Sequence, residues 1–274
     1  MQKIRLIPII LLRNGVVVQS KGFKRYQTLG NPSTIVWRFS NWYSDELIYL
    51  DISREAHYDL RRDDLKYNNI DNIQGIIKEV ACKCFMPLTV GGRISNLKDI
   101  FDRLNSGADK VSINSMAFCD SKLIEKSSKE FGSQCIVVSI DAKSKGNGTW
   151  EVFINSGKTP TGYTPKDWAI IAQDRGAGEI LLNSIDNDGS GKGYDISLIK
   201  SVVSAVNIPV IAVGGVGNWK HLQEGIHAGA SAVAAANIFQ YTENSLFQAK
   251  KHLYEGGFNV RKPVLKSIIS EGVF

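Results

Sequence analysis

Two aspartates in the second half of the chain follow apolar segments and are of a type that transfers protons. Asp141 ends the apolar run 135–141, and Asp188 lies in the loop after the run 179–183. A carboxyl group at the end of a buried strand is a good general acid or base. The alternative is that Asp141 only caps a loop, and the Asp- and Gly-rich segment around Asp188 is a weak signal by itself. We predict that both carboxyl groups act at one site.

A second chemical signal is a glycine-rich segment that occurs twice. Residues 90–114 and 213–237 each contain a strand end, a Gly-Gly pair, a helical stretch, a Gly-Ala step and a strand followed by Asn. Gly91 and Gly214 are 123 positions apart, which is close to half of the 274 residues. Glycine lets backbone N–H groups approach an anion, and a following helix N-terminus adds a favourable dipole. The repeat therefore predicts two phosphate sites on a protein made of two fused halves.

Four charged residues stand at the starts of predicted strands, and we name them the charged quartet: Arg5, Glu46, Lys110 and Glu179. Two cations and two anions balance, so they are able to share a buried position that none of them tolerates alone. One interpretation is a stabilising plug. The other is a gate that admits a small neutral molecule.

Apolar runs alternate with helical stretches along the whole chain, and the runs are nearly continuous, as in parallel strands covered on both faces. Eight strand–helix units in this length predict an α/β protein with a (βα)8 TIM barrel, in which the active site lies at the C-terminal strand ends. An open doubly wound sheet fits the even spacing and the repeat less well. We expect one barrel over 1–262, half-barrels at about 1–131 and 132–262, and a tail at 263–274. The predicted strands are Arg5–Leu12, Glu46–Asp51, Met86–Val90, Lys110–Asn114, Cys135–Asp141, Glu179–Asn183, Pro209–Val213 and Ala232–Ala236.

Composition narrows the function classes. The net charge of +6 and the isoelectric point near 9.0 fit either ordinary surface bias or a phosphorylated ligand. No basic block with interleaved aromatic residues points to nucleic acid. The four cysteines lack metal-site spacing, so we expect neither metal nor cofactor.

No run approaches the ~20 apolar residues of a membrane span. The N-terminal segment 1–15 reads as a strand rather than a signal peptide, so we expect a cytoplasmic protein.

Seven stretches closely resemble the cyclase subunit of imidazole glycerol phosphate synthase, and the similarity runs from Arg5 to about Arg261. They are DELIYLDI (45–52), TVGGRI (89–94), GADKVSIN (107–114), FGSQCIVVSIDAK (131–143), SGKTPTG (156–162), RGAGEILLNSIDNDG (175–189) and IAVGGVG (211–217). The resemblance implies a lyase-type barrel of the histidine biosynthesis family. It also implies that ammonia arrives from a glutaminase subunit docked on the N-terminal face.

The same resemblance assigns residues to roles. It makes the charged quartet the ammonia gate and places Asp109 and Gln134 near the glutaminase contact. It retains Asp141 and Asp188 as catalytic carboxylates. The phosphate contacts that it implies are Gly92, Asn114, Gly214, Gly215, Ala236 and Asn237.

Three positions depart from the family pattern. The first-strand acid is replaced by Leu11, and the lysine of the first loop is replaced by Gln19. Arg93 replaces a third glycine and is expected to add charge and bulk at one phosphate site. Leucine transfers no proton, and losing an acid–base group costs about 10²–10⁴-fold in rate. With these departures the chain resembles a divergent branch of the family, whose members serve the acetamidino-sugar modification of bacterial surface glycans.

We therefore expect an enzyme subunit of a glutamine-dependent amidotransferase system with little or no cyclase activity. A third, sugar-modifying protein is expected at the C-terminal face, with the loop 53–70 as a docking element, a lid or a tolerated insertion. A working cyclase for histidine synthesis that recruits Asp51 is the alternative. A scaffold that only activates the glutaminase and a sugar-phosphate isomerase of the sibling family are further hypotheses.

Overall fold

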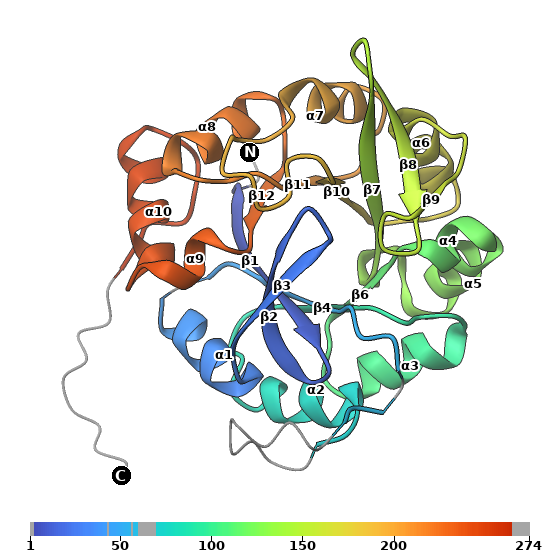
Figure 1. Ribbon diagram of the computed structural model, residues 1–274, viewed down its shortest axis with the longest axis horizontal. Helices are drawn as coiled ribbons and strands as arrows, with labels where there is room; N and C mark the ends of the chain where they lie inside the picture. The colour runs from blue at the N-terminus through green and yellow to red at the C-terminus, as the bar shows by residue number, and fades with distance from the viewer. Residues whose placement is uncertain (1–2, 43, 56, 60–69, 265–274) are drawn as a thin grey trace.

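The fold is a closed barrel of parallel strands, seen in the computed structural model, which describes residues 3–42, 44–55, 57–59 and 70–264. The strands pair in the order β10-β11-β12-β1-β4-β5-β6-β7, and a parallel β7–β10 pairing closes the ring. This confirms the predicted (βα)8 architecture (Figure 1). The barrel strands are β1 (Arg5–Arg13), β4 (Leu47–Asp51), β5 (Leu88–Gly91), β6 (Lys110–Ile113), β7 (Ile136–Gly146), β10 (Glu179–Ser184), β11 (Val210–Val213) and β12 (Ala232–Ala235).

Helices surround the barrel on its outside (Figure 1). Polar side chains fix several helix starts, because they accept a hydrogen bond from an otherwise unpaired N–H group of the first turn. Asn31, Asn72 and Asn96 each cap a helix in this way. The helices are α1 (Pro32–Asn41), α2 (Ile73–Ala81), α3 (Leu97–Asn105), α4 (Ser115–Cys119), α5 (Lys122–Phe131), α6 (Pro165–Asp174), α7 (Ile196–Val203), α8 (Trp219–His227), α9 (Ile238–Tyr241) and α10 (Ser245–Glu255).

Two apolar layers hold the barrel. The larger layer lies between the strands and the helices and includes Leu6, Val90 and Phe39. The smaller layer fills the barrel interior and consists mainly of Ile, Leu, Val and Ala. Each fully buried side chain of this size contributes roughly 1.5–3 kcal/mol. The interior is therefore a packed core rather than an open pore.

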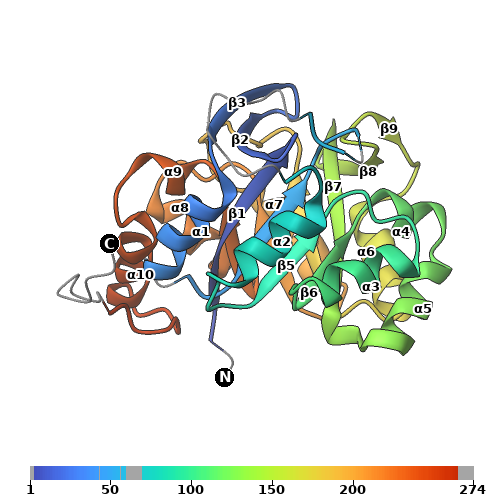
Figure 2. The same cartoon turned by 90° about the horizontal axis from the view of Figure 1, so that it is seen from below.

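The two halves of the chain add the same extra elements to the barrel. In the first half, β1 is followed by an antiparallel hairpin, β2 (Val16–Lys21) and β3 (Arg25–Gly30). In the second half, β7 continues into β8 (Thr149–Ile154) and β9 (Thr159–Pro160). The sequence patterns did not predict these hairpins. Figure 2 shows β2, β3 and β9 at the end of the barrel opposite the N-terminus, which is where the predicted mouth lies.

Each predicted strand is present, with ends that differ by a few residues. The largest difference is β7, which extends to Gly146 because its outer part pairs with β8 rather than with another barrel strand. Much of the predicted 53–70 loop, namely 56 and 60–69, lies outside the described residues, as does 265–274 of the predicted tail. Among the described helices, none is both long and apolar enough to cross a bilayer.

Candidate active site

Asp141 is buried in the middle of β7, close to where its pairing with β10 ends, and is held by two asparagines. Its carboxylate accepts hydrogen bonds from Asn114 Nδ2 at 3.0 Å and from Asn183 Nδ2 at 3.1 Å. Asn183 is also the β10 partner of Asp141 in the strand register, so backbone pairing brings the two side chains together. Burial raises the pKa of Asp141 to about 6, although both asparagine bonds oppose the shift. A carboxyl group with this pKa can act as a general base near neutral pH.

The raised pKa of Asp141 predicts a pH-dependent stability. An unfolded aspartate ionises near 3.8, whereas folded Asp141 ionises near 6. Between these values the folded state keeps a proton that the unfolded state has lost, so its contribution to stability is present below pH 3.8 and is lost as the pH rises through 6. The loss amounts to about 3 kcal/mol. Asp141→Asn should lack this loss, as measured by urea unfolding from about pH 4 to pH 7.

The comparison isolates Asp141 because every other titrating group is common to both proteins. The free energy of unfolding of the variant, relative to the wild type, should rise by about 3 kcal/mol across this range. A constant difference at all pH values would show that Asp141 titrates normally.

Asp188 lies over the same mouth, where it anchors the β2–β3 hairpin. Its carboxylate accepts from Ser20 Oγ at 2.8 Å and from the Phe23 amide at 3.2 Å. Burial raises its pKa, and its charge adds a smaller upward shift to the pKa of Asp141. The two predicted carboxylates are therefore electrostatically coupled. Asp188, however, is committed to hydrogen bonds within the protein, which favours a positioning role.

The position opposite Asp141 is apolar. Leu11 packs against the interior apolar layer and pairs in register with Leu50 of β4. Gln19 lies on β2, where its amide donates to Gln27 and accepts a hydrogen bond from the Tyr241 hydroxyl. Neither Leu11 nor Gln19 can exchange a proton at the mouth. Asp141 is thus without an acid–base partner on the β1 side.

Asp51 does not replace the missing acid. Its carboxylate is fully buried, forms an ion pair with Arg93 at 2.7 Å and accepts from the Tyr58 hydroxyl at 2.9 Å. It also accepts from the Ser53 amide at 2.9 Å, so it holds its own loop. Asp51 neighbours Leu50 along β4, and adjacent side chains on a strand point to opposite faces. Since Leu50 contacts the interior layer, Asp51 faces away from it.

The Arg93 side chain extends to Asp51 on β4, and its guanidinium lies 2.7 Å from that carboxylate. Arg93 has a φ of 51°, a value that few residues other than glycine adopt. Asp51 therefore neutralises much of the charge of Arg93, and the effect of Arg93 on the predicted phosphate site stays a prediction.

The glycines of both repeats are required by close backbone packing. A Cβ atom on Gly92 would lie 2.0 Å from the Asp51 carbonyl oxygen, and one on Gly215 would lie 2.0 Å from the Gly193 carbonyl oxygen. Gly214 has a φ of 98° and the Ser184 carbonyl oxygen 2.9 Å from the Cβ position. These positions therefore require glycine, and their part in phosphate binding stays a prediction.

The asparagines of the predicted phosphate sites are already engaged. Asn114 Nδ2 bonds to Asp141, and Asn237 Nδ2 bonds to the Ser20 carbonyl oxygen at 2.9 Å. Ala236 packs against the interior apolar layer. At these positions, backbone amides rather than side chains are the groups that can hold a phosphate.

The charged quartet forms a closed ring at the N-terminal strand ends. Arg5 lies 2.6 Å from Glu46 and 3.1 Å from Glu179. Lys110 lies 3.2 Å from both carboxylates. Thr89 donates a further hydrogen bond of 2.8 Å to Glu46. Every side chain of the ring thus contacts two of opposite charge.

Burial gives this ring its electrostatic character. The Glu46 side chain is only 2% exposed, and Arg5 and Lys110 are 18% and 17% exposed. Burial opposes the charge on Arg5, but attraction to Glu179 and Glu46 outweighs it, so the pKa of Arg5 lies above its ordinary value. Removing one member would leave a buried charge unpaired, which costs about 3–5 kcal/mol. The four side chains therefore stabilise one another as a set.

Asp109 and Gln134 lie on the surface around the ring, next to the first residues of β6 and β7. Asp109 is exposed but accepts a hydrogen bond from the Leu88 amide at 2.8 Å. Phe85, which precedes β5 at the same end of the barrel, is 91% exposed.

Sequence patterns missed several residues of this region. Asn183 was part of a recognised motif, but its bond to Asp141 depends on strand register. Ser20 belongs to a hairpin that was not predicted. No group of three or more His, Cys, Asp or Glu side chains able to hold a metal occurs among the described residues.

A family model described as "Histidine biosynthesis protein" matches residues 5–245 of the chain.

Proposed function

Because the chain belongs to the histidine biosynthesis protein family, we propose that it is the barrel subunit of a glutamine-dependent amidotransferase. In this proposal a separate glutaminase docks on the N-terminal face and releases ammonia beneath the charged quartet. The observation that carries the proposal is the combination of an intact quartet with Leu11 opposite Asp141. The route for a small molecule is retained while one half of the acid–base machinery is lost.

The chemistry of the interior supports the passage of neutral ammonia. Beyond the quartet, the interior layer consists of side chains such as Ile48, Val137 and Leu181. A charged ammonium ion would lose its hydration there at a high cost in free energy, whereas neutral ammonia carries no net charge and loses much less. Since ion pairs join the quartet and the layer is packed, passage requires side chains to move briefly aside.

The product side of the proposal is a sugar. Ammonia that leaves the mouth would be used by a third, sugar-modifying protein in the acetamidino modification of a surface glycan. Support comes from the resemblance to that branch and from Leu11 and Gln19, which both lack the proton-transfer groups of the cyclase pattern. The β2–β3 hairpin, pinned by Asp188, offers such a partner a fixed surface at the mouth.

A second candidate is a working cyclase in histidine synthesis, and Asp141 is the observation that favours it. A buried carboxyl group with a pKa of about 6 is suited to general acid–base chemistry and is costly to keep for structure alone. This candidate requires an acid in place of Leu11, and Asp51 is already paired with Arg93.

Complementation separates the two candidates. We expect that this protein, expressed together with its glutaminase, does not restore growth without histidine to a strain that lacks its own cyclase. The reason is the missing proton donor at Leu11, since loss of such a group lowers the rate by about 10²–10⁴-fold. An authentic cyclase expressed at the same level is the control. Growth equal to the control would favour the cyclase.

A further inference from the structure

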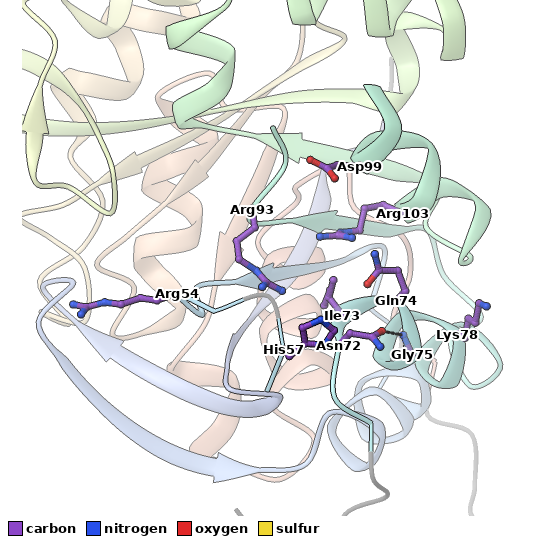
Figure 3. A pocket seen from close by; sticks show the side chains of 10 residues that line it. All are labelled: Arg54, His57, Asn72, Ile73, Gln74, Gly75, Lys78, Arg93, Asp99 and Arg103. Carbon is purple, nitrogen blue, oxygen red and sulfur yellow. Dashed lines mark hydrogen bonds between the residues drawn. The ribbon is translucent and has the colours of Figure 1, made fainter. Parts of the chain in front are cut away.

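A cavity of about 690 Å³ lies on the outer side of the barrel, between the loop that follows β4, helix α2 and helix α3. Its lining carries four cationic side chains and one carboxylate. In Figure 3 the Arg103 side chain points towards Arg93, and both guanidinium groups lie above the start of α2. The lining residues are Arg54, His57, Asn72, Ile73, Gln74, Gly75, Lys78, Arg93, Asp99 and Arg103.

Arg103 is the unusual member of this lining. Its residue is only 3% exposed, yet within the described part of the chain it forms no ion pair. Among the described residues its one hydrogen bond is long, 3.4 Å from Nη2 to the Gly92 carbonyl oxygen, and its buried Nε has no partner there. Burial and the nearby charge of Arg93 lower the pKa of Arg103. Asp51 and Asp99 lie close enough to offset part of this effect, but neither forms an ion pair with Arg103, and a buried guanidinium without such a pair is unfavourable.

The charges of the described residues around the cavity do not balance. Four cations (Arg54, Lys78, Arg93 and Arg103) face Asp99 in the lining and Asp51, which is paired with Arg93. Among these residues the formal surplus is two positive charges. His57 is engaged separately with Asp71 at 3.2 Å. A phosphate monoester carries −1.5 to −2 charges at neutral pH, as a phosphorylated side chain does.

We propose that this cavity binds the phosphate group of a phosphorylated small molecule through Arg103 and Lys78, with Arg93 held in place by Asp51. Arginine is suited to this because its planar guanidinium donates two parallel hydrogen bonds to phosphate oxygens. Helix α2 begins at the same cavity, so its N-terminal dipole adds to the attraction.

The size of the cavity indicates an organic phosphate rather than free phosphate. Cavities of about 300–1,000 Å³ hold ligands of metabolite size. Gln74, together with the exposed Arg54 and His57, provides polar groups for the remainder of the ligand. We therefore assign the ligand to the class of phosphorylated polyhydroxyl compounds such as sugar phosphates.

This site adjoins one of the two phosphate sites predicted at the mouth, because Arg103 bonds to the Gly92 carbonyl oxygen. Its other lining residues come from the loop after β4 and from α2 and α3. The proposal does not depend on ammonia transfer, since a protein with no partner would still carry this cavity.

Calorimetry with glucose 6-phosphate, inorganic phosphate and glucose tests the proposal. We expect glucose 6-phosphate to bind more tightly than inorganic phosphate, and glucose not to bind. Lys78→Glu and Arg54→Glu should each weaken glucose 6-phosphate binding by about tenfold, because each reverses a charge at the cavity. Both residues are exposed, so the variants should fold. Lys126→Glu on the exposed side of α5 is the matched control and should bind as the wild type does.

Crystals soaked in tungstate distinguish the cavity from the mouth. An anomalous peak beside Arg103 is expected. Tungstate found only at the glycine turns, or glucose 6-phosphate affinity unchanged in both glutamate variants, would overturn the site. Equal affinity for inorganic phosphate and glucose 6-phosphate would overturn the assignment to an organic phosphate.

Discussion

Supplied with free ammonia, the purified barrel should turn over the cyclase substrate about 10²–10⁴-fold more slowly than a cyclase that carries aspartate at the position of Leu11. Free ammonia removes any dependence on the glutaminase, so the assay measures the barrel alone. The expected defect follows from the mouth geometry. Asp141 is buried, paired with two asparagines and tuned to a pKa of about 6, but Leu11 faces the same interior and cannot move a proton.

The variant Leu11→Asp tests the cause of that defect. The new carboxyl group should raise the rate with free ammonia by at least about tenfold, a fraction of the general acid–base contribution. Leu11→Asn is the matched control, because asparagine has nearly the same shape and polarity but transfers no proton. Wild-type turnover equal to that of an ordinary cyclase would contradict the proposal. An equal gain in both variants would show that polarity, rather than proton transfer, limits the reaction.

Blocking the charged quartet should separate glutamine-dependent from ammonia-dependent product formation. In Glu179→Trp a bulky side chain replaces a ring member that lies 3.1 Å from Arg5 and 3.2 Å from Lys110. Product formed from glutamine should fall by about 10- to 100-fold, because ammonia that escapes to solvent loses the advantage of local delivery. Product formed from added ammonia should change by less than about twofold, since bulk ammonia reaches the mouth from the C-terminal side. The assay contains the barrel, the glutaminase and the sugar-modifying partner.

Two controls keep this result interpretable. Glu179→Gln removes the charge but not the side-chain volume, so its glutamine-dependent activity should exceed that of the tryptophan variant. Glutamine hydrolysis, measured in the same samples, shows whether the glutaminase still docks and is active. Unchanged glutamine-dependent product formation in a folded Glu179→Trp variant would contradict the channel and favour a scaffold that only activates the glutaminase.

The barrel itself was predictable because local patterns carry it. Nearly continuous apolar runs such as 135–141 can be satisfied only by strands covered on both faces, and each was followed by a helical stretch. Asn96 before α3 and Pro165 at the start of α6 mark helix starts by their own local chemistry. The repeat of the Gly-Gly turn identified two equivalent halves. Contact between the four members of the quartet also followed, because parallel strands start at the same end of a barrel.

The direction of individual side chains was not predictable. Arg93 lies one residue beyond Gly92, and the sequence places it beside a phosphate site. Its guanidinium pairs with the carboxylate of Asp51, 42 positions earlier. The role of Asp188 likewise depends on a hairpin whose amides it binds across 165 positions. Such contacts between distant residues leave no local pattern.

The sequence by itself determined the architecture, the charged quartet and the loss of an acid at Leu11, because these depend on residue type and on position along a strand. Only the tertiary structure decided that Asp141 is paired with Asn114 and Asn183, that Asp51 is unavailable as an acid, and that Arg103 is buried in a cationic cavity. The physical reason is that pKa, burial and charge balance depend on the distances between groups, and strand register and helix packing set those distances.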